Sequence, residues 1–432
     1  MDGVIVDVET VDLRFPTSWA LDGSDAVNEA PDYSAAYVVL RTDVGLEGHG
    51  FTFTIGRGNE LAVAAAEAIG RRARGWSIAE LVADPGGFSR HLQADSQLRW
   101  LGPAKGTIQL GLAAVVNAAW DLIGKATGRP VWKVLADMSP QQLVDLVDWR
   151  YLRDTLTPEA ALEMLEKQVP GRAEREAVLR EEGYPAYTTS AGWLGYDDDK
   201  LVRLCREAVA AGWESIKLKV GGNLEDDVRR CALARDVLGP HGRLMIDANQ
   251  ALGAGDAVRW MEALAPSDVW WFEEPTSPDD VLAHAAIARA IAPTRVATGE
   301  HAHNAVMFKQ FLAAGAMGVC QLDAARPGGV DEAVAVLLLA AAHDVPVCPH
   351  AGGVGLCELV QHLSMFDYVA VSGSREERMI EYVDHLHEHF VDPVRMQGPS
   401  YLPPTRPGYS AEILAETRAA YAFPHGAVWA GP

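Results

Sequence analysis

From residue 184 to residue 400, short apolar runs alternate with helical segments, and this repeat restricts the fold more than any other feature of the chain. Alternation of strand and helix is typical of a parallel sheet, in which each helix crosses back over the sheet. Eight runs have strand character: 185–189, 215–220, 244–246, 269–272, 294–298, 319–322, 345–348 and 378–382. Residues 368–371 compete for the last position. Eight strands are what a closed (β/α)8 barrel requires.

An ionisable residue stands at or just past the end of six consecutive strands. These residues are Lys219, Asp247, Glu273, Glu300, Asp323 and His350, at separations of 28, 26, 27, 23 and 27 positions. The carboxyl ends of barrel strands all open on one face, where the active sites of barrel enzymes lie. A single acidic residue after a strand is commonly a helix cap or a loop charge. Three carboxylates on consecutive strands instead favour one shared site.

Asp247, Glu273 and Glu300 offer oxygen ligands without a thiolate. This donor set suits Mg²⁺, which keeps water and substrate oxygens in its remaining positions. We therefore expect one Mg²⁺ per subunit on these three residues. Asn249 lies two positions beyond Asp247, on the same side if the strand continues, where its amide can hydrogen-bond a ligand beside the ion.

Two lysines share one face of the second barrel strand. Lys217 and Lys219 are two positions apart, so both amines project toward the barrel axis if the register is right. They could instead extend to solvent, but a barrel strand is buried on both faces. Two adjacent cations lower each other's pKa, which predicts that one amine serves as a neutral base near neutral pH.

Asp323 and His350 end adjacent strands, so the carboxylate can fix the tautomer of the imidazole and raise its basicity. His350 is therefore a candidate acid or base, acting on the side of a bound substrate opposite to the lysines. Glu381, on the predicted eighth strand, would complete the ring.

Outside the barrel the pattern changes. Residues 1–139 mix strand-like and helical runs and predict an α+β domain, with a long polar loop between Leu21 and Tyr33. Residues 140–183 are helical and highly charged, which indicates a surface insertion. Residues 401–432 are proline-rich and irregular, and we expect this tail to pack on the first domain.

Composition excludes several classes of partner. The net charge is −22, with no Lys/Arg-rich run, so neither nucleic acid nor an anionic membrane is expected to bind. The apolar windows fall short of the roughly 20 residues that a membrane span needs. The first residues resemble a strand rather than a signal peptide, and the five scattered cysteines form no CxxC pair, so we expect a cytoplasmic location with reduced thiols.

Three other patterns are weaker. The histidines of residues 384–389 lack a matched set of ligands, so a surface or interface role is favoured over a metal site. The glycines of residues 352–355 lack the context of a dinucleotide-binding turn. His301 and His303 follow Glu300 closely and are interpreted as loop residues beside the site.

Together, Lys217-Leu218-Lys219, Asp247-Ala248-Asn249, Glu273-Glu274-Pro275, Gly299-Glu300 and the Asp323/His350 pair resemble the mandelate racemase subgroup of the enolase superfamily. Longer stretches, including residues 21–26, 31–37, 274–280 and 350–358, resemble the L-fuconate dehydratases of that subgroup, and the likeness covers nearly the whole chain. One difference is visible at Ala251-Leu252-Gly253, where the resembling enzymes tend to carry Arg-Trp-Asp.

The resemblance implies that residues 1–139 and the tail form a cap over the barrel mouth, in a homo-oligomer. It implies Mg²⁺-dependent dehydration of an acid sugar, L-fuconate to 2-keto-3-deoxy-L-fuconate, with Lys219 and His350 exchanging protons. Which of the two is the base depends on the C2 configuration. The implied substrate-binding residues are Gly23, Ser24, Asp25 and Tyr33 from the cap, and Lys217, Asn249 and Glu381 from the barrel. A racemase or epimerase of a 2-hydroxy acid, and a sugar-acid-binding protein without activity, remain as alternatives.

Overall fold

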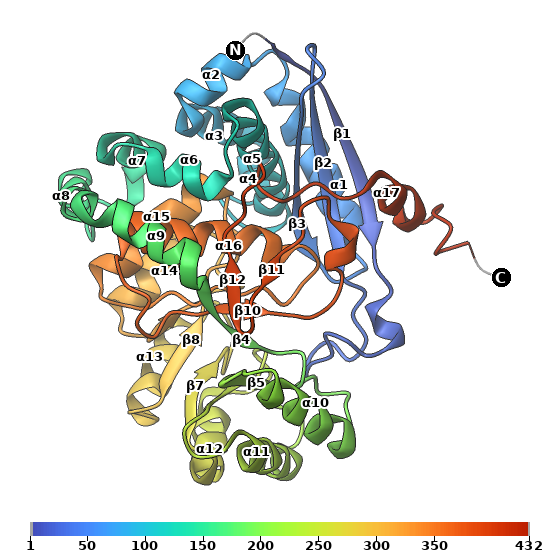
Figure 1. Cartoon of the computed structure of the whole chain (residues 1–432), viewed down its shortest axis with the longest axis vertical. Coiled ribbons are helices and arrows are strands. Elements are labelled where there is room, and N and C mark those ends of the chain that lie inside the picture. Colours follow the sequence, from blue (N-terminus) through green and yellow to red (C-terminus); the bar gives the residue numbers. More distant parts are fainter. Residues whose placement is uncertain (1–2, 431–432) are drawn as a thin grey trace.

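The cap is an antiparallel three-stranded sheet backed by helices (Figure 1). We analysed a computed structural model that describes residues 3–430, so residues 1–2 and 431–432, at the outer ends of the predicted cap and tail, lie outside the described residues. Its sheet is formed in order by β1 (Ile5–Arg14), β2 (Ser34–Thr42) and β3 (Glu47–Thr54). Two glycines of β3 face α5 (Gly106–Thr127), and a Cβ on Gly50 would collide with the backbone of Ala118. The helix therefore lies directly against the sheet.

The helix α5 is longer and more apolar than the sequence windows suggested. It has 22 residues with a mean hydropathy of 1.3 in its most apolar window, so by length and composition it alone among the helices of residues 3–430 could cross a membrane. However, 78% of that window is buried inside the structure, against β2, β3 and α1 (Asn59–Gly70). The apolar surface is thus used as the core of the cap.

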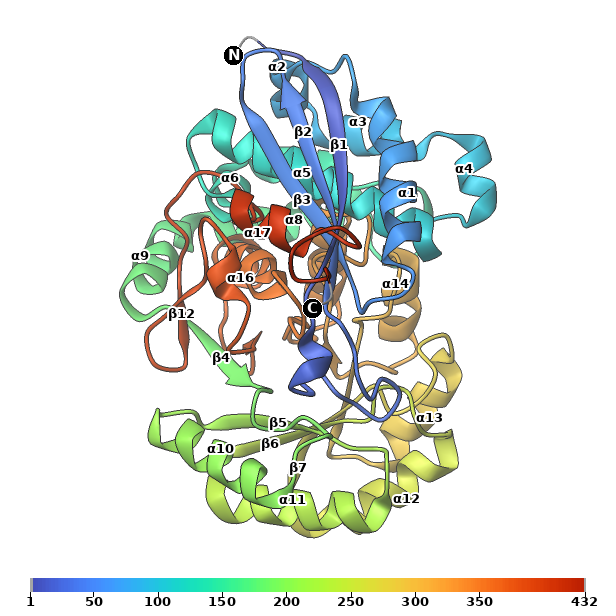
Figure 2. The same cartoon turned by 90° about the vertical axis from the view of Figure 1, so that its right-hand side faces the viewer.

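The barrel lies below the cap in Figures 1 and 2. Its parallel strands are β4 (Tyr184–Thr188), β5 (Ser215–Lys219), β6 (Arg243–Asp247), β7 (Val269–Glu273), β8 (Arg295–Thr298), β9 (Val319–Cys320) and β10 (Ile380–Tyr382), and β10 pairs with β4. The seventh predicted strand is reduced to one bridge between Val347 and Cys320. Pro346 has no N–H to donate, which limits the ladder there. Residues 367–371 form a π-helix, so the ambiguous eighth strand is the one containing Glu381.

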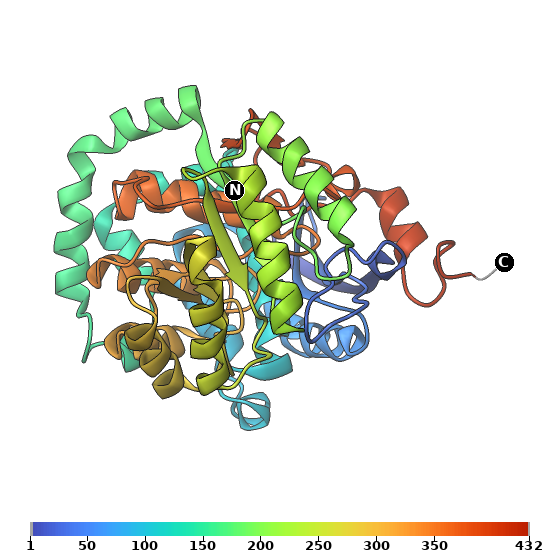
Figure 3. The ribbon, with the colours of Figure 1, turned by 90° about the horizontal axis from the view of Figure 1, so that it is seen from below.

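Helices follow the strands and cover the outside of the barrel. They are α10 (Asp198–Ala210), α11 (Leu224–Leu238), α12 (Ala254–Leu264), α13 (Val281–Ala290), α14 (Ala305–Ala313), α15 (Val330–Ala342) and α16 (Leu356–Phe366). In the cap, α2 (Ile78–Ala83), α3 (Pro85–Gln93) and α4 (Ser96–Leu101) precede α5 along the chain. Between α5 and the barrel come α6 (Val131–Asp137), α7 (Pro140–Leu146), α8 (Pro158–Gln168) and α9 (Arg172–Glu182), and the last two contact the π-helix. Seen from below, residues 158–182 form an outer rim, in green (Figure 3).

Side chains that face the barrel axis form two layers. Apart from the buried Lys217 of β5, which is in register with Met245, the lower layer is apolar and comprises Tyr187, Met245, Trp271, Ala297, Val319, Cys348 and Met379. Two positions further along the chain, the upper layer is polar and buried, and comprises Thr189, Lys219, Asp247, Glu273, Gln321, His350 and Glu381. Because side chains alternate across a strand, residues two apart share a face. The apolar layer therefore forms the floor under a ring of polar groups.

The C-terminal segment joins barrel and cap. β12 (Ser400–Leu402) pairs antiparallel with β4, β11 (Arg395–Met396) pairs antiparallel with β12, and α17 (Ala415–Tyr421) contacts β1. Asp121 of α5 is the central anchor of this segment. Its carboxylate accepts hydrogen bonds from the backbone N–H groups of His49 (2.9 Å) and Tyr409 (2.7 Å) and pairs with Lys125 (2.8 Å).

We expect Asp121→Asn to lower the free energy of unfolding by about 2 kcal/mol, because it removes a buried charge partner from Lys125. Denaturant unfolding of the full chain measures this loss. Glu67→Gln is the matched control, since the Glu67–Arg71 pair has the same i,i+4 spacing but is exposed, and its loss should stay near 0.5 kcal/mol or less. Equal losses in both variants would contradict the anchoring role.

Candidate active site

Three carboxylates converge at the barrel mouth. Asp247 and Glu273 end the adjacent strands β6 and β7, and Glu300 follows β8 after Gly299. Gly299 has a φ of +143°, and a Cβ on it would lie 2.9 Å from the backbone of Gln321. Ligand atoms of the three carboxylates lie within 4.8 Å of one another, and Glu300 Oε2 is buried without a hydrogen-bond partner.

The charges of this group are unbalanced. Burial and the neighbouring Asp247 raise the pKa of Glu273 well above its ordinary value. Repulsion between buried carboxylates is relieved by a divalent cation. An all-oxygen donor set with one unpartnered oxygen fits Mg²⁺, so the residues predicted as its ligands are arranged to hold it.

The two lysines of β5 lie among these carboxylates. Lys217 Nζ is 2.5 Å from Glu273 Oε1 and 2.9 Å from Glu381 Oε1, and Lys219 Nζ is 2.5 Å from Asp247 Oδ2. The prediction that one of these amines has a lowered pKa is wrong for this arrangement. Burial lowers the pKa of Lys219, and Lys217 lowers it further, but Asp247, Glu300 and Glu273 together raise it above the ordinary value. The prediction failed because it considered the neighbouring lysine and not the carboxylates on adjacent strands.

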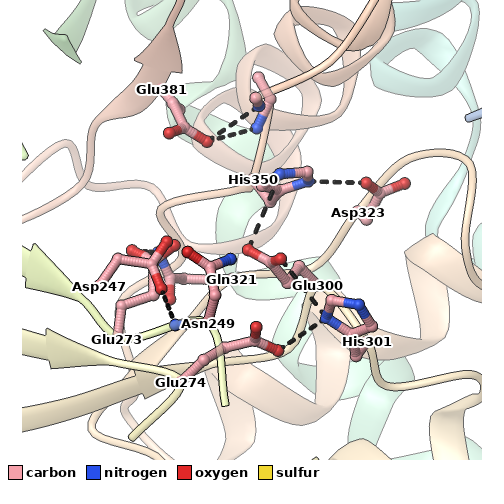
Figure 4. Close-up of polar contacts among 12 residues, drawn as sticks. Asp247, Asn249, Glu273, Glu274, Glu300, His301, Gln321, Asp323, His350 and Glu381 are labelled. Carbon is pink, nitrogen blue, oxygen red and sulfur yellow. Dashed lines mark hydrogen bonds and ion pairs between the residues drawn. The ribbon is translucent and has the colours of Figure 1, made fainter. Parts of the chain in front are cut away.

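His350 and Asp323 form the expected pair. His350 Nδ1 is 2.8 Å from Asp323 Oδ2, and His350 Nε2 lies 3.7 Å from Glu300 Oε2 (Figure 4). Asp323 is itself held, because its Oδ1 accepts the N–H of Ala325 at 2.6 Å. Burial opposes the imidazolium, but Glu300 and Asp323 raise the pKa of His350 above its ordinary value.

A cavity of about 300 Å³ lies between the barrel mouth and the cap. Seven of the predicted site residues line it: Gly23, Asp25, Tyr33, Lys219, Asn249, Glu300 and His350. Lys219 and His350 thus face the same space beside the carboxylates. Ser24, Lys217 and Glu381 are close by but do not line the cavity. Ser24 Oγ instead accepts the N–H of Gly195 at 3.0 Å, and Lys217 and Glu381 bind each other beneath the cavity.

The cap loop that carries Gly23 is docked on the barrel. Tyr196 donates a hydrogen bond to Asp22 Oδ1 at 2.6 Å, and Leu194 N–H donates to the carbonyl of Ser24 at 3.1 Å. Gly23 itself has a φ of +81°, and a Cβ there would collide with the ring of Tyr33. Only glycine fits this position without strain.

Some site residues were missed from the sequence. Gln321 donates to Glu273 Oε2 at 2.6 Å, and Thr189 donates to Glu381. Gln321 lies two positions before Asp323, so strand alternation could have revealed it. Trp193 and Arg326 also line the cavity but stand on loops, where no periodicity marks them.

His301 lies beside the site, as interpreted, and also takes part in a second carboxylate group. Its Nδ1 is 2.8 Å from Glu274 Oε1 and 3.4 Å from Glu300 Oε1. Although burial opposes its charge, Glu274 raises the pKa of His301 to about 10. An imidazolium there neutralises Glu274, which favours the group of Asp247, Glu273 and Glu300 as the metal site.

Two sequence features fall outside the cavity. Leu252, in the segment that differs from the resembling enzymes, packs in the core between strands and outer helices, and none of residues 251–253 lines the cavity. The segment that differs therefore does not contact the cavity directly. In residues 384–389, His387 pairs with the buried Glu358 at 2.7 Å, and His385 stacks on Tyr33. These histidines thus pack between cap and barrel.

Comparison with known proteins places the whole chain in one family. The family model described as Enolase C-terminal domain-like matches residues 200–417. Mitochondrial enolase superfamily member 1 of Homo sapiens is 52% identical over 431 residues, covering 99% of this chain and 97% of the relative. The chain belongs to the enolase superfamily. The crystal structure of that human protein superposes with a TM-score of 0.98 over 99% of this chain and 98% of its own.

Two further relatives carry substrate names. L-galactonate dehydratase of Hypocrea jecorina is 51% identical over 418 residues, covering 96% of this chain and 92% of the relative. L-talarate/galactarate dehydratase from Salmonella typhimurium, solved with Mg and L-lyxarohydroxamate, has a TM-score of 0.74 at 23% identity, covering 97% of this chain and 93% of its own. The present chain and this enzyme share the mandelate racemase-like fold of a cap and a barrel. Structural relatives of the present chain bind Mg.

We expect Asp247→Asn to abolish Mg²⁺ binding, because one anionic ligand of three is lost. Mg²⁺ that binds only the folded chain raises its unfolding temperature, so the wild type should show this shift in a MgCl₂ titration and Asp247→Asn should not.

Glu274→Gln is the matched control, because Glu274 belongs only to the group with His301. This variant should keep the Mg²⁺-dependent shift. The reverse pattern, with binding lost in Glu274→Gln and kept in Asp247→Asn, would move the ion to the other group.

Proposed function

We propose that the chain is a Mg²⁺-dependent acid sugar dehydratase that acts on L-fuconate. The observation that carries the proposal is that Lys219 and the His350–Asp323 pair line one cavity beside a three-carboxylate ligand set. Similarity over nearly the full chain to an L-galactonate dehydratase supports the same reaction class. L-fuconate is 6-deoxy-L-galactonate, so the two acids share their configuration at C2 to C5 and differ only at C6.

The barrier in such a dehydration lies in removing the weakly acidic proton at C2, next to a carboxylate. Mg²⁺ bound to Asp247, Glu273 and Glu300 would supply positive charge for the substrate carboxylate and would reduce the hold of these residues on the lysines. Lys219 is the only lysine of residues 3–430 that lines the cavity, and it takes the C2 proton in our assignment. Lys217, fixed between Glu273 and Glu381, adds positive charge beneath it.

His350 then delivers a proton to the C3 hydroxyl, which leaves as water. Asp323 holds Nδ1, so that Nε2 carries the transferred proton toward the cavity. The resulting enol gains a proton at C3 and becomes the 2-keto-3-deoxy acid. The cap loops around Gly23 and Tyr33 close the cavity above the substrate and exclude water from these steps.

The direct test incubates the full chain and MgCl₂ with a panel of acid sugars, including L-fuconate and L-galactonate, and detects 2-keto acids as semicarbazones. We expect L-fuconate to give a keto acid and EDTA to abolish the reaction. A C2 epimer without keto acid would instead indicate an epimerase. Binding without any turnover would indicate a sugar-acid-binding protein.

Replacement of the two proton-transfer residues should separate the steps. Lys219→Ala should stop both C2 exchange in D₂O and dehydration, with a loss of about 10²-fold to 10⁴-fold. His350→Asn should lose keto-acid formation and keep C2 exchange. NMR of the substrate in D₂O measures exchange in both variants.

Lys200→Ala and His343→Asn are the controls, because both residues lie outside the cavity, and they should match the wild type. If Lys219→Ala kept full exchange and His350→Asn lost it, the base would be His350. Full exchange in both variants would contradict the assignment of either residue as the base.

A further inference from the structure

We propose that Arg326 binds the end of the acid sugar remote from the reacting carbons and enables the cavity to accept an acid with a terminal hydroxyl, L-galactonate, in addition to L-fuconate. The inference rests on the proposed function and assigns a specificity role within the same site. It concerns the one carbon, C6, at which L-galactonate and L-fuconate differ.

The backbone that carries Arg326 is fixed from both sides. Asp323, three positions earlier, accepts the N–H of Ala325 and holds His350. From the cap, buried Thr52 donates to the carbonyl of Ala325 at 2.7 Å, and buried Asn117 donates to the carbonyl of Ala324 at 3.0 Å. Arg326 therefore starts from a defined point, where cap and barrel meet.

The guanidinium has no partner of its own. Arg326 lines the cavity and is half-buried, but within residues 3–430 it forms no hydrogen bond, and no carboxylate oxygen lies within 4.0 Å of it. Other enclosed arginines donate at least part of their hydrogen bonds to the protein. Arg230, for example, donates to the carbonyls of Tyr196 and Trp193. A guanidinium that lines a cavity without an acceptor from the protein has donors available for a ligand.

The position of Arg326 determines which part of the substrate it contacts. Lys219, Glu300 and His350 occupy the barrel side of the cavity, where C1 to C3 must lie for the proposed chemistry. Arg326 instead lies on the loop that meets the cap, and the wall that the cap gives to the same cavity includes Leu110 and Thr107 of α5. An acid sugar with its carboxylate at the metal ligands extends its remaining carbons toward that wall. A C6 hydroxyl can accept from Arg326, whereas a methyl group leaves the guanidinium unsatisfied.

The test compares kcat/KM for L-galactonate and L-fuconate in the wild type, Arg326→Met and Arg326→Lys. We expect Arg326→Met to lower the L-galactonate to L-fuconate ratio at least about tenfold, mainly through the KM for L-galactonate, and Arg326→Lys to restore part of it. Arg206→Met is the matched control, because Arg206 is an exposed arginine of α10 without a partner in the described structure. Its ratio should stay at the wild-type value.

An unchanged ratio in Arg326→Met, or an equal loss with both acids, would overturn the inference while leaving the proposed function intact. A wild type that dehydrates neither acid would overturn both. The Mg²⁺-dependent shift of the unfolding temperature shows that each variant is folded. If Arg326→Met does not fold, Arg326→Ala is measured in its place, and an unchanged ratio there overturns the inference.

Discussion

The structure depends on holding a ring of charged groups inside the mouth of a barrel. Taking charges out of water costs several kcal/mol for each ion unless each charge is paired and hydrogen-bonded. Here Lys217 bridges Glu273 and Glu381, and Lys219 pairs with Asp247. Carboxylates nevertheless outnumber the lysines, and Glu300 keeps an oxygen unpartnered. The excess of negative charge that makes the ring costly to bury also suits it to bind a divalent cation.

The cap makes this ring usable, because an open ring would remain hydrated. Contacts between cap and barrel involve buried polar groups rather than apolar packing alone. Asp331, at the start of α15, accepts from Ser89 of α3 at 2.6 Å and from Trp120 of α5 at 3.1 Å. Glu332 accepts from Gln109 of α5 at 2.7 Å. The helix after β9 is thereby joined to the cap, and the loop before it, with Asp323 and Arg326, is held in place.

The parts of the site that follow from strand alternation could be predicted from the sequence. Asp247, Glu273 and His350 lie at strand ends, where spacing alone brings them to one face of a barrel. The predicted seventh strand was too long because the cost of Pro346 to the ladder was not weighed. The pKa of Lys219 was misjudged because it depends on Asp247, a partner from the next strand. Which side chains become partners across neighbouring strands depends on the strand register, and the register cannot be read from the sequence alone.

Residues on loops were harder to predict, and the reason lies in what fixes them. Arg326 has no period and no neighbouring motif, and its place is determined by Thr52 and Asn117, more than 200 positions earlier in the chain. In the proposed reaction, the ring acts on the substrate carboxylate and on the next two carbons, C2 and C3. Every 2,3-dihydroxy acid possesses these groups. Discrimination among such acids must therefore come from the loops that meet the rest of the substrate. The residues that are easiest to predict identify the reaction, and those that are hardest to predict select its substrate.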